Sequence, residues 1–377
     1  MTAAVSATPP VAVVLVDDSP VQRRFMRAAI EADADFTVVA EARNGSEAVA
    51  LVARLRPGAV LMDLDLPVMS GIEAIERIMS ASPTPILVYS AFVGGTNSVN
   101  ALEALAAGAV DVLCKPGPDD TGTLEQYATA LRRKLRVASR VRVITHPRGR
   151  LRSQGMAGAT PALGGGARRP MGTATTATID SRSGLSDVRL VAIGASTGGP
   201  QALLTLLGHL PADLEQAVLV VQHMAEGFIP GLASWLDGLV GMPVGVGFDG
   251  CRLAPGTVTI APSGANMLVT DDRLRTKCVP PAPGQFHIPG IDATFESIAG
   301  SLGAKAIGVL LTGMGRDGAA GLLSMRARGA LTLGQDEATS TVYGMPAAAY
   351  EMAAVERQLA LDDIAPAVLG ALGRKLA

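Results

Sequence analysis

The chain has 377 residues, too many for one average domain, so two domains plus connecting chain are expected. Hydrophobic residues make up 48 % and charged residues 18 %, which excludes a wholly disordered protein. Aromatic residues make up only 3 %, which argues against a protein that stacks nucleic-acid bases. The sequence contains neither an apolar run of ~18 residues nor a basic, apolar leader, so we expect a cytoplasmic protein without membrane insertion.

The three cysteines, Cys114, Cys251 and Cys278, are odd in number and far apart in the sequence. This spacing fits a reducing compartment and argues against a disulfide framework or a zinc site. The four histidines form neither an H-E-x-x-H nor a C-x-x-C-associated pattern, so no transition-metal site is expected.

Charge divides the chain into three parts. Residues 11–137 carry 16 acids and 12 bases, a net charge of −4, and residues 187–377 carry 17 acids and 12 bases, a net charge of −5. Residues 138–186 carry one acid and eight arginines, a net charge of +7, within a Gly-, Ala- and Thr-rich stretch. We therefore predict a first domain over 1–137, a flexible linker over 138–186 and a second domain over 187–377. The linker arginines could bind nucleic acid, but short basic blocks without aromatic residues are more often simply solvated, so no nucleic acid is expected.

The first part alternates short apolar strands with amphipathic helices. This alternation predicts an open parallel sheet with helices on both faces, a doubly wound fold of the flavodoxin-like kind. The predicted strands are Val11–Val16, Thr37–Ala40, Ala59–Met62, Ile86–Val88 and Val110–Leu113. The predicted helices include Ser19–Ala32, Gly45–Arg54, Gly71–Ser80 and Val99–Ala107.

Polar residues follow four of these strands, at the sheet edge where open α/β sheets bind ligands. They are Asp17 with Asp18, Asp63, Ser90 and Lys115. Three carboxylates at one edge repel each other unless a cation neutralises them, and Mg²⁺ prefers carboxylate and water ligands. Lys115 and Ser90 could bind an anion carried by one carboxylate. Each residue alone could be an ordinary loop residue, but polar residues at every one of these strand ends argue against that interpretation.

Residues 11–116 resemble a response-regulator receiver domain. The resemblance rests on the Asp17-Asp18 pair, Asp63 followed by Pro67 and Gly71, Ser90-Ala91 and Lys115-Pro116. It implies that Asp63 is the phosphoacceptor, that Asp18 and Asp63 hold Mg²⁺ with Asp17 acting largely through water, and that Ser90 and Lys115 bind the phosphoryl oxygens. Two positions depart from the receiver pattern: Val112 replaces a frequent aromatic switch residue, and Ser70 replaces a frequent Asp or Asn.

The second part is again of the α/β type. Arg189–Ile193, Ala217–Gln222 and Ala306–Leu311 are predicted buried strands, and Val258–Ile260 with Met267–Val269 is predicted to form a short hairpin.

A reactive constellation follows these buried strands. Ser196 lies in a Gly-rich strand-to-helix turn, which exposes its hydroxyl, although a G-x-S-x-G match alone also fits a phosphate-binding or plain tight turn. His223 follows the next strand and could activate the serine, and Asp317 follows the third and could orient the imidazole. Glycines around Met314 free backbone amides for an oxyanion.

This second part resembles the catalytic domain of the CheB family, the protein-glutamate methylesterases of bacterial chemotaxis. The resemblance rests on the segments 194–200, 222–224, 311–315 with 317–318, and 335–338 with 344–346. It implies a triad of Ser196, His223 and Asp317, with the backbone amides near Thr197 and Met314 as the oxyanion hole. The segment 287–292 departs from the family pattern, because Ile288 stands where the family often has Arg and Gly290 where it often has Ser.

We therefore expect a phosphorylation-regulated esterase with a mainly parallel α/β hydrolase domain. Its expected reactions are hydrolysis of glutamate γ-methyl esters on chemoreceptors and deamidation of receptor glutamines, with a CheA-type histidine kinase as phosphodonor. Mg²⁺ is expected at the receiver and no cofactor at the hydrolase. A weakly active or non-enzymatic adaptor, and the same enzyme in a pathway that does not control motility, remain open alternatives. A DNA-binding response regulator is disfavoured, because the second part is acidic and lacks a helix-turn-helix signal.

Overall fold

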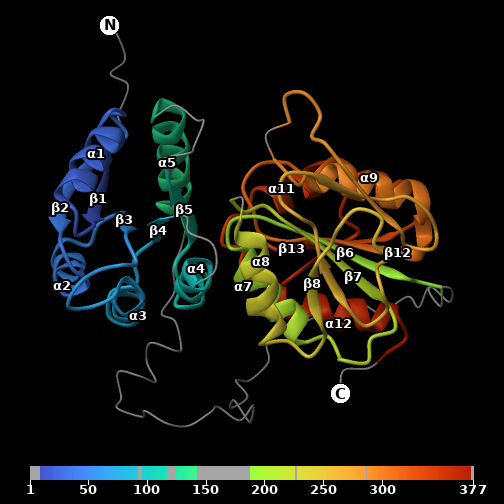
Figure 1. Cartoon of the computed structure of the whole chain (residues 1–377). Helices are drawn as coiled ribbons and strands as arrows, with labels where there is room; N and C mark the ends of the chain where they lie inside the picture. Colours follow the sequence, from blue (N-terminus) through green and yellow to red (C-terminus); the bar gives the residue numbers. More distant parts are fainter. Residues whose placement is uncertain are drawn as a thin grey trace, which may run out of the picture.

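The computed structural model describes residues 9–91, 96–116, 124–141, 187–225, 227–285 and 287–374. These residues form a five-stranded, a seven-stranded and a two-stranded sheet (Figure 1). Most of the predicted linker, residues 142–186, lies outside the described residues. Within the described ranges, no helix is both long enough and apolar enough to span a bilayer.

The N-terminal sheet has the strand order β2-β1-β3-β4-β5, and all its neighbouring strands are parallel. The strands are β1 (Val11–Val16), β2 (Phe36–Ala42), β3 (Ala59–Met62), β4 (Ile86–Ala91) and β5 (Asp111–Lys115). The helices are α1 (Pro20–Glu31), α2 (Gly45–Leu55), α3 (Gly71–Ala81), α4 (Thr96–Ala106) and α5 (Leu124–Ala138). The chain reverses its direction of winding between β1 and β3, which is where the fold class places a ligand site.

Helices cover both faces of this sheet, as predicted. Val13 and Leu15 of β1 pack with α1 and α5, whereas Val14 and Val16 pack with α2, α3 and α4. The alternation follows from the two-residue period of a strand. Because both faces are buried, β1 is almost continuously apolar, which made its bounds predictable from sequence.

The C-terminal sheet has the order β14-β13-β12-β6-β7-β9-β8, and all its neighbouring strands are parallel. Its strands are β6 (Leu190–Ala195), β7 (Ala217–Gln222), β8 (Val244–Val246), β9 (Val258–Ile260), β12 (Ala306–Leu310), β13 (Leu331–Gln335) and β14 (Arg357–Leu359). From β6 the chain builds outward through β7 on one side and through β12 on the other. This reversal puts the ends of β6, β7 and β12 beside one another at the sheet edge.

The larger sheet is also buried on both faces. Val191 and Ile193 of β6 share a core with α7, α8 and α12, while Leu190 and Ala192 share one with α9, α10 and α11. The helices are α7 (Gly199–Gly208), α8 (Phe228–Asp237), α9 (Ile291–Ser301), α10 (Ala319–Ala327), α11 (Met345–Glu351) and α12 (Leu361–Ala371), with a 3₁₀ turn at Gly303–Lys305.

The predicted hairpin of Val258–Ile260 with Met267–Val269 is wrong. β9 is buried and joins the main sheet between β7 and β8, whereas β10 (Asn266–Val269) pairs antiparallel with β11 (Thr276–Val279). Short apolar runs are ambiguous in their pairing partner, and β7 offers an apolar neighbour that buries Val258 and Ile260 on the sheet.

The two sheets are joined by packed helices rather than only by the linker. α4 packs against α7 and α8, and Figure 1 shows α4 on the side of the N-terminal sheet that faces these helices. Gln201 of α7 donates from Nε2 to the Leu105 carbonyl at 2.9 Å, and Thr197 donates from Oγ1 to Asp111 Oδ2 at 3.0 Å. The second bond touches the residue after Ser196, so this packing directly adjoins the predicted hydrolase site.

Candidate functional sites

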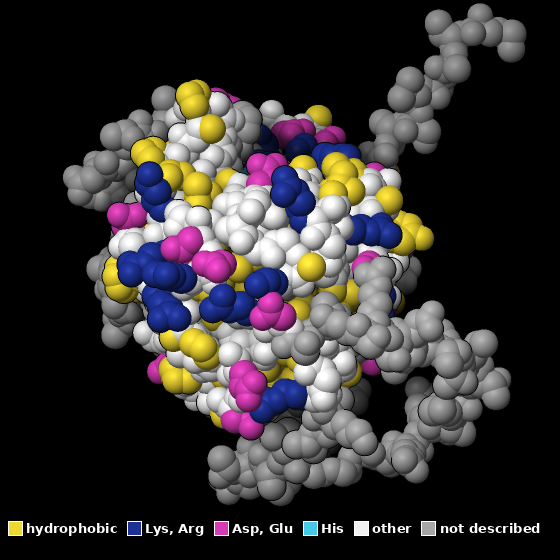
Figure 2. Space-filling model, turned by 90° about the vertical axis from the view of Figure 1, so that its right-hand side faces the viewer, with side chains coloured by type: hydrophobic (Ala, Val, Ile, Leu, Met, Phe, Trp, Pro, Cys, Tyr) yellow, Lys and Arg dark blue, Asp and Glu magenta, His cyan; other side chains and the backbone are white. Residues whose placement is uncertain are grey.

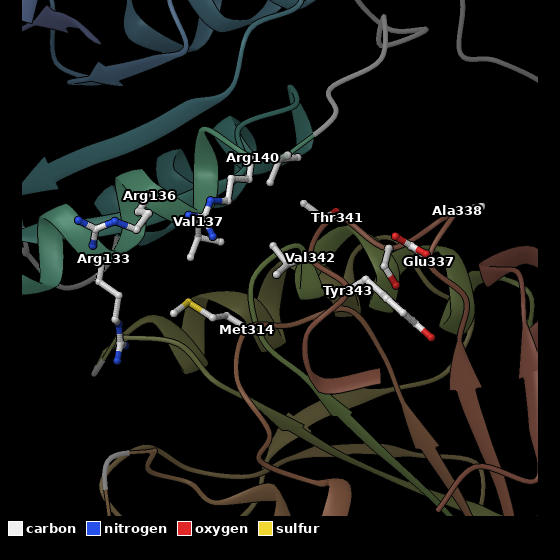
Figure 3. A pocket seen from close by; sticks show the side chains of 12 residues that line it. Arg133, Arg136, Val137, Arg140, Met314, Glu337, Ala338, Thr341, Val342 and Tyr343 are labelled. Atoms are coloured by element: carbon white, nitrogen blue, oxygen red, sulfur yellow. The ribbon is translucent and has the colours of Figure 1, made fainter. Parts of the chain in front are cut away.

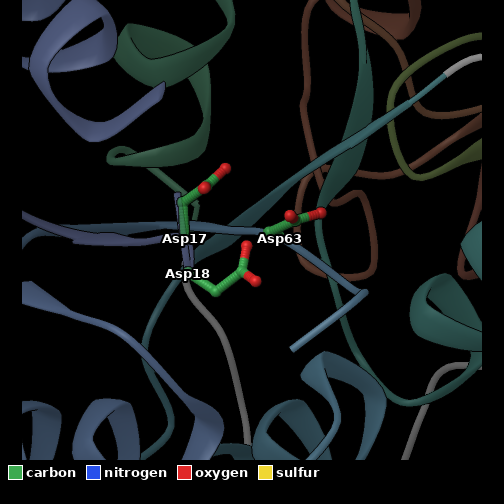
Figure 4. Close-up of side chains that lie close together, drawn as sticks. All are labelled: Asp17, Asp18 and Asp63. Atoms are coloured by element: carbon green, nitrogen blue, oxygen red, sulfur yellow. The ribbon is translucent and has the colours of Figure 1, made fainter. Parts of the chain in front are cut away.

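The three predicted carboxylates of the N-terminal domain converge (Figure 4). One oxygen from each of Asp17, Asp18 and Asp63 lies within 4.8 Å of the other two. Asp17 is fully buried and Asp63 is 4 % exposed, whereas Asp18 is exposed. Lys115 Nζ lies 2.9 Å from Asp17 Oδ2 and 2.6 Å from Asp63 Oδ2. The ammonium therefore bridges the two carboxylates and offsets their mutual repulsion.

Burial sets the electrostatics of this pocket. It raises the pKa of the Asp63 carboxyl, with the neighbouring Asp17 acting in the same direction against the opposing effect of Lys115. Burial opposes the charge of Lys115, but the hydrogen bonds to Asp63 and Asp17 outweigh it and raise the pKa of that ammonium. The raised pKa means that the Asp63 carboxylate is more basic than an exposed one.

One further predicted residue also lies at this edge of the sheet. Ser90 is buried at the end of β4, where its neighbour Ala91 is aligned with Lys115 of β5. Tyr89 was not predicted: its ring lies 4.8 Å from Lys115 Nζ and its hydroxyl donates to Gln22 at 3.2 Å. Burial raises the pKa of this phenol. In the sequence it reads as one more apolar strand residue.

The structure shows why Gly71 is a glycine and what Ser70 and Val112, the two departures from the receiver pattern, do. A Cβ on Gly71 would lie 2.2 Å from the carbonyl oxygen of Asp63, so only glycine allows α3 to begin this close to the pocket. Ser70 caps α3 by accepting from the Glu73 amide at 3.2 Å, the role that Asp or Asn also plays at a helix start. Val112 is buried in β5 and has no ring that could change orientation.

The second site begins with the turn from β6 to α7. Gly198 has φ +79°, and a Cβ there would lie 2.4 Å from Thr341 Oγ1. A Cβ on Gly199 would lie 2.0 Å from Gln222 Oε1. Gln222 Nε2 in turn donates to the carbonyls of Ser196 and His223, both at 2.8 Å. One buried amide therefore fixes the positions of the predicted nucleophile and base.

His223 and Asp317 are in direct contact. His223 Nε2 lies 2.8 Å from Asp317 Oδ2, and the ring's other nitrogen, Nδ1, is buried without a hydrogen-bond partner. The His223 amide donates to the Ala195 carbonyl at 2.9 Å, which holds the imidazole beside Ser196. Ser196 and His223 line one cavity of about 320 Å³. The free nitrogen is thus the one available to a proton inside this cavity.

Asp317 is surrounded by donors. It accepts from the amides of Ile291 at 2.8 Å, Asp292 at 3.0 Å and Gly318 at 3.1 Å. Although burial acts to raise the pKa of Asp317, the hydrogen bond and charge of His223 and these amides lower it below its usual value. Burial raises the pKa of the neighbouring Asp292 to about 6, and the charge of Asp317 adds to that effect.

The predicted oxyanion amides lie on two loops that polar side chains hold together. Met314 lines the cavity with Ser196, and Thr312 Oγ1 donates to the Thr197 carbonyl at 3.0 Å. Gln335, fully buried, accepts from the Thr312 amide at 2.8 Å. Among the described residues, neither the Thr197 nor the Met314 amide donates to a protein acceptor. Both amides are therefore available to an anionic oxygen.

The N-terminal domain covers this cavity. Asp111, Arg133, Lys134 and Val137 complete its lining, and Lys134 Nζ lies 2.7 Å from Asp111 Oδ2. A larger cavity of about 950 Å³ adjoins it, sharing Arg133, Val137 and Met314. Figure 3 shows Arg133, Arg136 and Arg140 on one wall, and on the other Glu337, Ala338, Thr341, Val342 and Tyr343.

The segment 287–292, which departs from the family pattern, lies at this site. Ile288 lines the cavity. A Cβ on Gly290 would lie 2.5 Å from Gln285 Nε2, so the glycine makes room for that amide. His287, which the sequence did not single out, stacks on His223 with a centroid separation of 4.6 Å and an interplanar angle of 6°. Because His287 and His223 are far apart in the sequence, this contact could not be predicted from it.

Away from the sites, the face seen in Figure 2 mixes charges. Lys and Arg side chains lie next to Asp and Glu side chains, and hydrophobic side chains are scattered over it. The net charge of −5 in the second part therefore does not produce a uniformly acidic surface on this side.

Two protein families match the chain. The family described as CheB methylesterase matches residues 191–368, and the family described as response regulator receiver domain matches residues 13–125. The crystal structure of the Thermotoga maritima CheB methylesterase catalytic domain is 30 % identical, covering 48 % of this chain and 98 % of that chain with a TM-score of 0.47.

Two relatives match the chain over nearly its whole length. Protein-glutamate methylesterase/protein-glutamine glutaminase 3 of Paramagnetospirillum magneticum is 41 % identical over 96 % of both chains. Its counterpart 1 of Caulobacter vibrioides is 40 % identical over 95 % of this chain and 96 % of its own. With a receiver followed by this catalytic domain over nearly its whole length, the chain belongs to the CheB family of protein-glutamate methylesterases/protein-glutamine glutaminases.

Proposed function

We propose that this chain hydrolyses glutamate γ-methyl esters, and deamidates glutamines, on chemoreceptors, through Ser196, His223 and Asp317. The observation that carries the proposal is the contact between Asp317 and His223, because His223 lines the same cavity as Ser196. Asp317 keeps its charge and so holds and stabilises the imidazole, while Nδ1 is left to exchange a proton with Ser196.

The proposed reaction has two halves. Ser196 Oγ attacks the ester carbonyl as its proton passes to His223 Nδ1, and the oxyanion accepts from the Thr197 and Met314 amides. The C–O bond to the methoxy group then breaks, and His223 returns the proton so that methanol leaves. Water then gives a proton to His223 as its oxygen attacks the acyl carbon. The bond from that carbon to Ser196 Oγ breaks, and His223 passes the proton to Oγ, which releases glutamate and restores both residues. A glutamine side chain would release ammonia in place of methanol.

The first test is methanol release from a methylated receptor fragment. Wild type is expected to release methanol, and Ser196→Ala to release essentially none, because the variant lacks the attacking oxygen and the neighbouring Thr197 hydroxyl is bonded to Asp111. Ser324→Ala, in α10 and not among the residues that line the cavity, serves as the matched control. Near-normal release by Ser196→Ala would remove the triad assignment. Binding of the receptor without methanol release by wild type would favour the adaptor alternative.

The receiver is proposed to be phosphorylated on Asp63 by a histidine kinase. The carboxylate donor set of Asp17, Asp18 and Asp63 fits Mg²⁺, which would neutralise charge between these oxygens and the phosphoryl group when bound. Ser90 and Lys115 would bind the phosphoryl oxygens. In this proposal Lys115 gives up its contact with Asp63 to the added group, because the two compete for the same oxygen.

The unphosphorylated receiver is proposed to restrain the hydrolase. Support comes from α5, which covers the cavity, and from Asp111, which accepts from Thr197 beside the nucleophile. Asp111→Ala should therefore raise basal methanol release by about two- to tenfold, the equivalent of one lost hydrogen bond in the covered state. Glu47→Ala, on the remote helix α2, should leave it unchanged. A basal rate that does not change in Asp111→Ala would contradict this restraint.

A further inference from the structure

His287 is a second imidazole in the cavity that the proposed reaction does not use. It stacks on His223 almost in parallel, at a ring separation of 4.6 Å and an angle of 6°. Asp317 occupies the edge of the His223 ring through Nε2, so the two contacts act on different parts of the same imidazole. The edge contact fixes one nitrogen, and the face contact fixes the plane in which the other nitrogen points.

The backbone that carries His287 is fixed by two side-chain amides. Gln285 Nε2 donates to the His287 carbonyl at 2.6 Å. Gln285 and Asn266 exchange two hydrogen bonds of 2.8 Å, and Asn266 Oδ1 also accepts from the Gly290 amide at 2.7 Å. Asn266 is 4 % exposed, so this network is shielded from water.

The same segment also builds the Asp317 site. Directly after Gly290, the amides of Ile291 and Asp292 donate to the two oxygens of Asp317. One short stretch of chain therefore holds a ring against the face of His223 and a carboxylate against its edge. Because this stretch is short, the ring and the carboxylate cannot shift independently of each other.

Several charges face His287. Burial lowers the pKa of its imidazole, and His223 and Arg133 of α5 act in the same direction, against Asp317. Lys134 and Asp111 line the same cavity and pair with each other. His287 is therefore uncharged at neutral pH, and an uncharged ring does not oppose the proton that His223 must accept. A charged one, stacked at this distance, would repel it.

We propose that His287 is a positioning residue for the reaction: as an uncharged stacking partner it holds the His223 ring with Nδ1 toward Ser196. The proposal rests on the proposed role of His223 as base. It predicts that a flat, uncharged ring can replace His287, that a small side chain cannot, and that protonation of His287 suppresses turnover.

The experiment compares His287→Phe, His287→Ala and the matched control His209→Phe, an exposed histidine at the end of α7, in the full-length chain. Basal methanol release is measured between pH 5 and 9 without phosphodonor, so that the receiver state is the same throughout. His287→Ala should lower kcat roughly ten- to hundredfold with little change in KM, because a displaced base loses alignment. His287→Phe should stay within about threefold of wild type, since it preserves the stacked plane.

The pH profile separates positioning from a merely structural role. At low pH the wild-type rate should fall more steeply than that of His287→Phe, because only the wild type can take up a proton on the ring that stacks on the base. Equal loss in the Phe and Ala variants, with thermal unfolding like wild type, would overturn the stacking role. So would an Ala variant of wild-type rate, or identical slopes in the wild type and the Phe variant.

A measurement that needs no turnover distinguishes this inference from the proposed function. The chain has four histidines, so the imidazole C–H resonances can be assigned by comparing the variants. The His287 resonance should titrate below the ordinary histidine range. If wild type releases no methanol, the proposed function fails whatever this titration gives. If methanol is released but His287 titrates in the ordinary range, the inference fails alone.

Discussion

Asp63 and Asp317 are the same residue type, each following a central strand of a parallel sheet, yet their environments act in opposite directions. Asp63 accepts from one backbone amide, that of Leu64, and lies beside another carboxylate, so burial prevails and its pKa is raised. Asp317 accepts from three backbone amides and a histidine, so its pKa is lowered despite burial. The number of fixed donors, rather than depth, decides whether the pKa of a buried carboxyl is lowered or raised.

The largest expected effect comes from removing the charge of Asp317. Asp317→Asn keeps the shape but presents a neutral amide to His223, so the tautomer and the stabilisation of the charged ring are both lost. Methanol release should fall roughly 10³–10⁴-fold. The measurement is kcat on a methylated receptor fragment, with Asp272→Asn, an exposed loop change, as control. A loss of less than about tenfold would show that the negative charge of Asp317, which the surrounding donors maintain, does not matter for turnover.

Removing the reactive oxygen of Asp63 should act only on regulation. Asp63→Asn cannot form the acyl phosphate, so the ratio of methanol release with and without acetyl phosphate and Mg²⁺ should fall to about one. The basal rate should remain close to that of wild type. If Asp63→Asn were still stimulated by the phosphodonor, another residue would be the acceptor and the contrast between the two carboxyls would lose its meaning.

A smaller effect is expected from the segment that supplies two of the Asp317 amides. Gly290→Ser adds a Cβ that would lie 2.5 Å from Gln285 Nε2, a flexible side chain that can move away at the cost of its bond to the His287 carbonyl. Methanol release should fall about two- to tenfold, the equivalent of one hydrogen bond. In a Gln285→Ser background the same substitution should cost less, and equal costs in both backgrounds would contradict the account.

Asp292 offers the smallest effect and an intermediate case, because it accepts from the Gly321 amide at 2.7 Å but carries a pKa raised to about 6. The folded state therefore binds more protons than the unfolded state between about pH 4 and 6, and the free energy of unfolding falls as pH rises through that window. Asp292→Asn should raise Tm by roughly 2–6 °C at pH 7–8, with no difference at pH 4.

The readout for Asp292→Asn is specific to the catalytic domain, since the single tryptophan, Trp235, lies on α8. Asp272→Asn again serves as the exposed control. A lower Tm for Asp292→Asn at pH 7, or a gain that persists at pH 4, would show that the carboxyl is stabilising when charged.

Sequence predicted the residues at the ends of buried strands well. Asp17, Asp63, Ser196 and His223 follow apolar runs whose length and composition allow only a central strand, and parallel strands bring such ends to one edge. Short or polar strands were less predictable: the pairing of β9 depends on which neighbour buries it, and nothing local specifies that.

The supporting side chains could not be predicted. Gln222, Asn266 and Gln335 are buried amides whose partners lie on loops distant in sequence, so their roles depend on the assembled fold. His287 contacts His223 across 64 positions of chain, and Asp292 acquires its shifted pKa only from its neighbours in space. These residues follow from packing rather than from pattern.

The strand β5 has a consequence for how the two reaction centres communicate. At one end Lys115 pairs with Asp63, and at the other Asp111 accepts from Thr197. Five extended residues span only about 13 Å, and an extended strand within a sheet cannot shorten or lengthen. Because Val112 has no aromatic ring to reorient, a displacement of Lys115 would be conveyed along the backbone itself. A single rigid strand therefore connects the proposed phosphorylation site with the proposed site of ester cleavage.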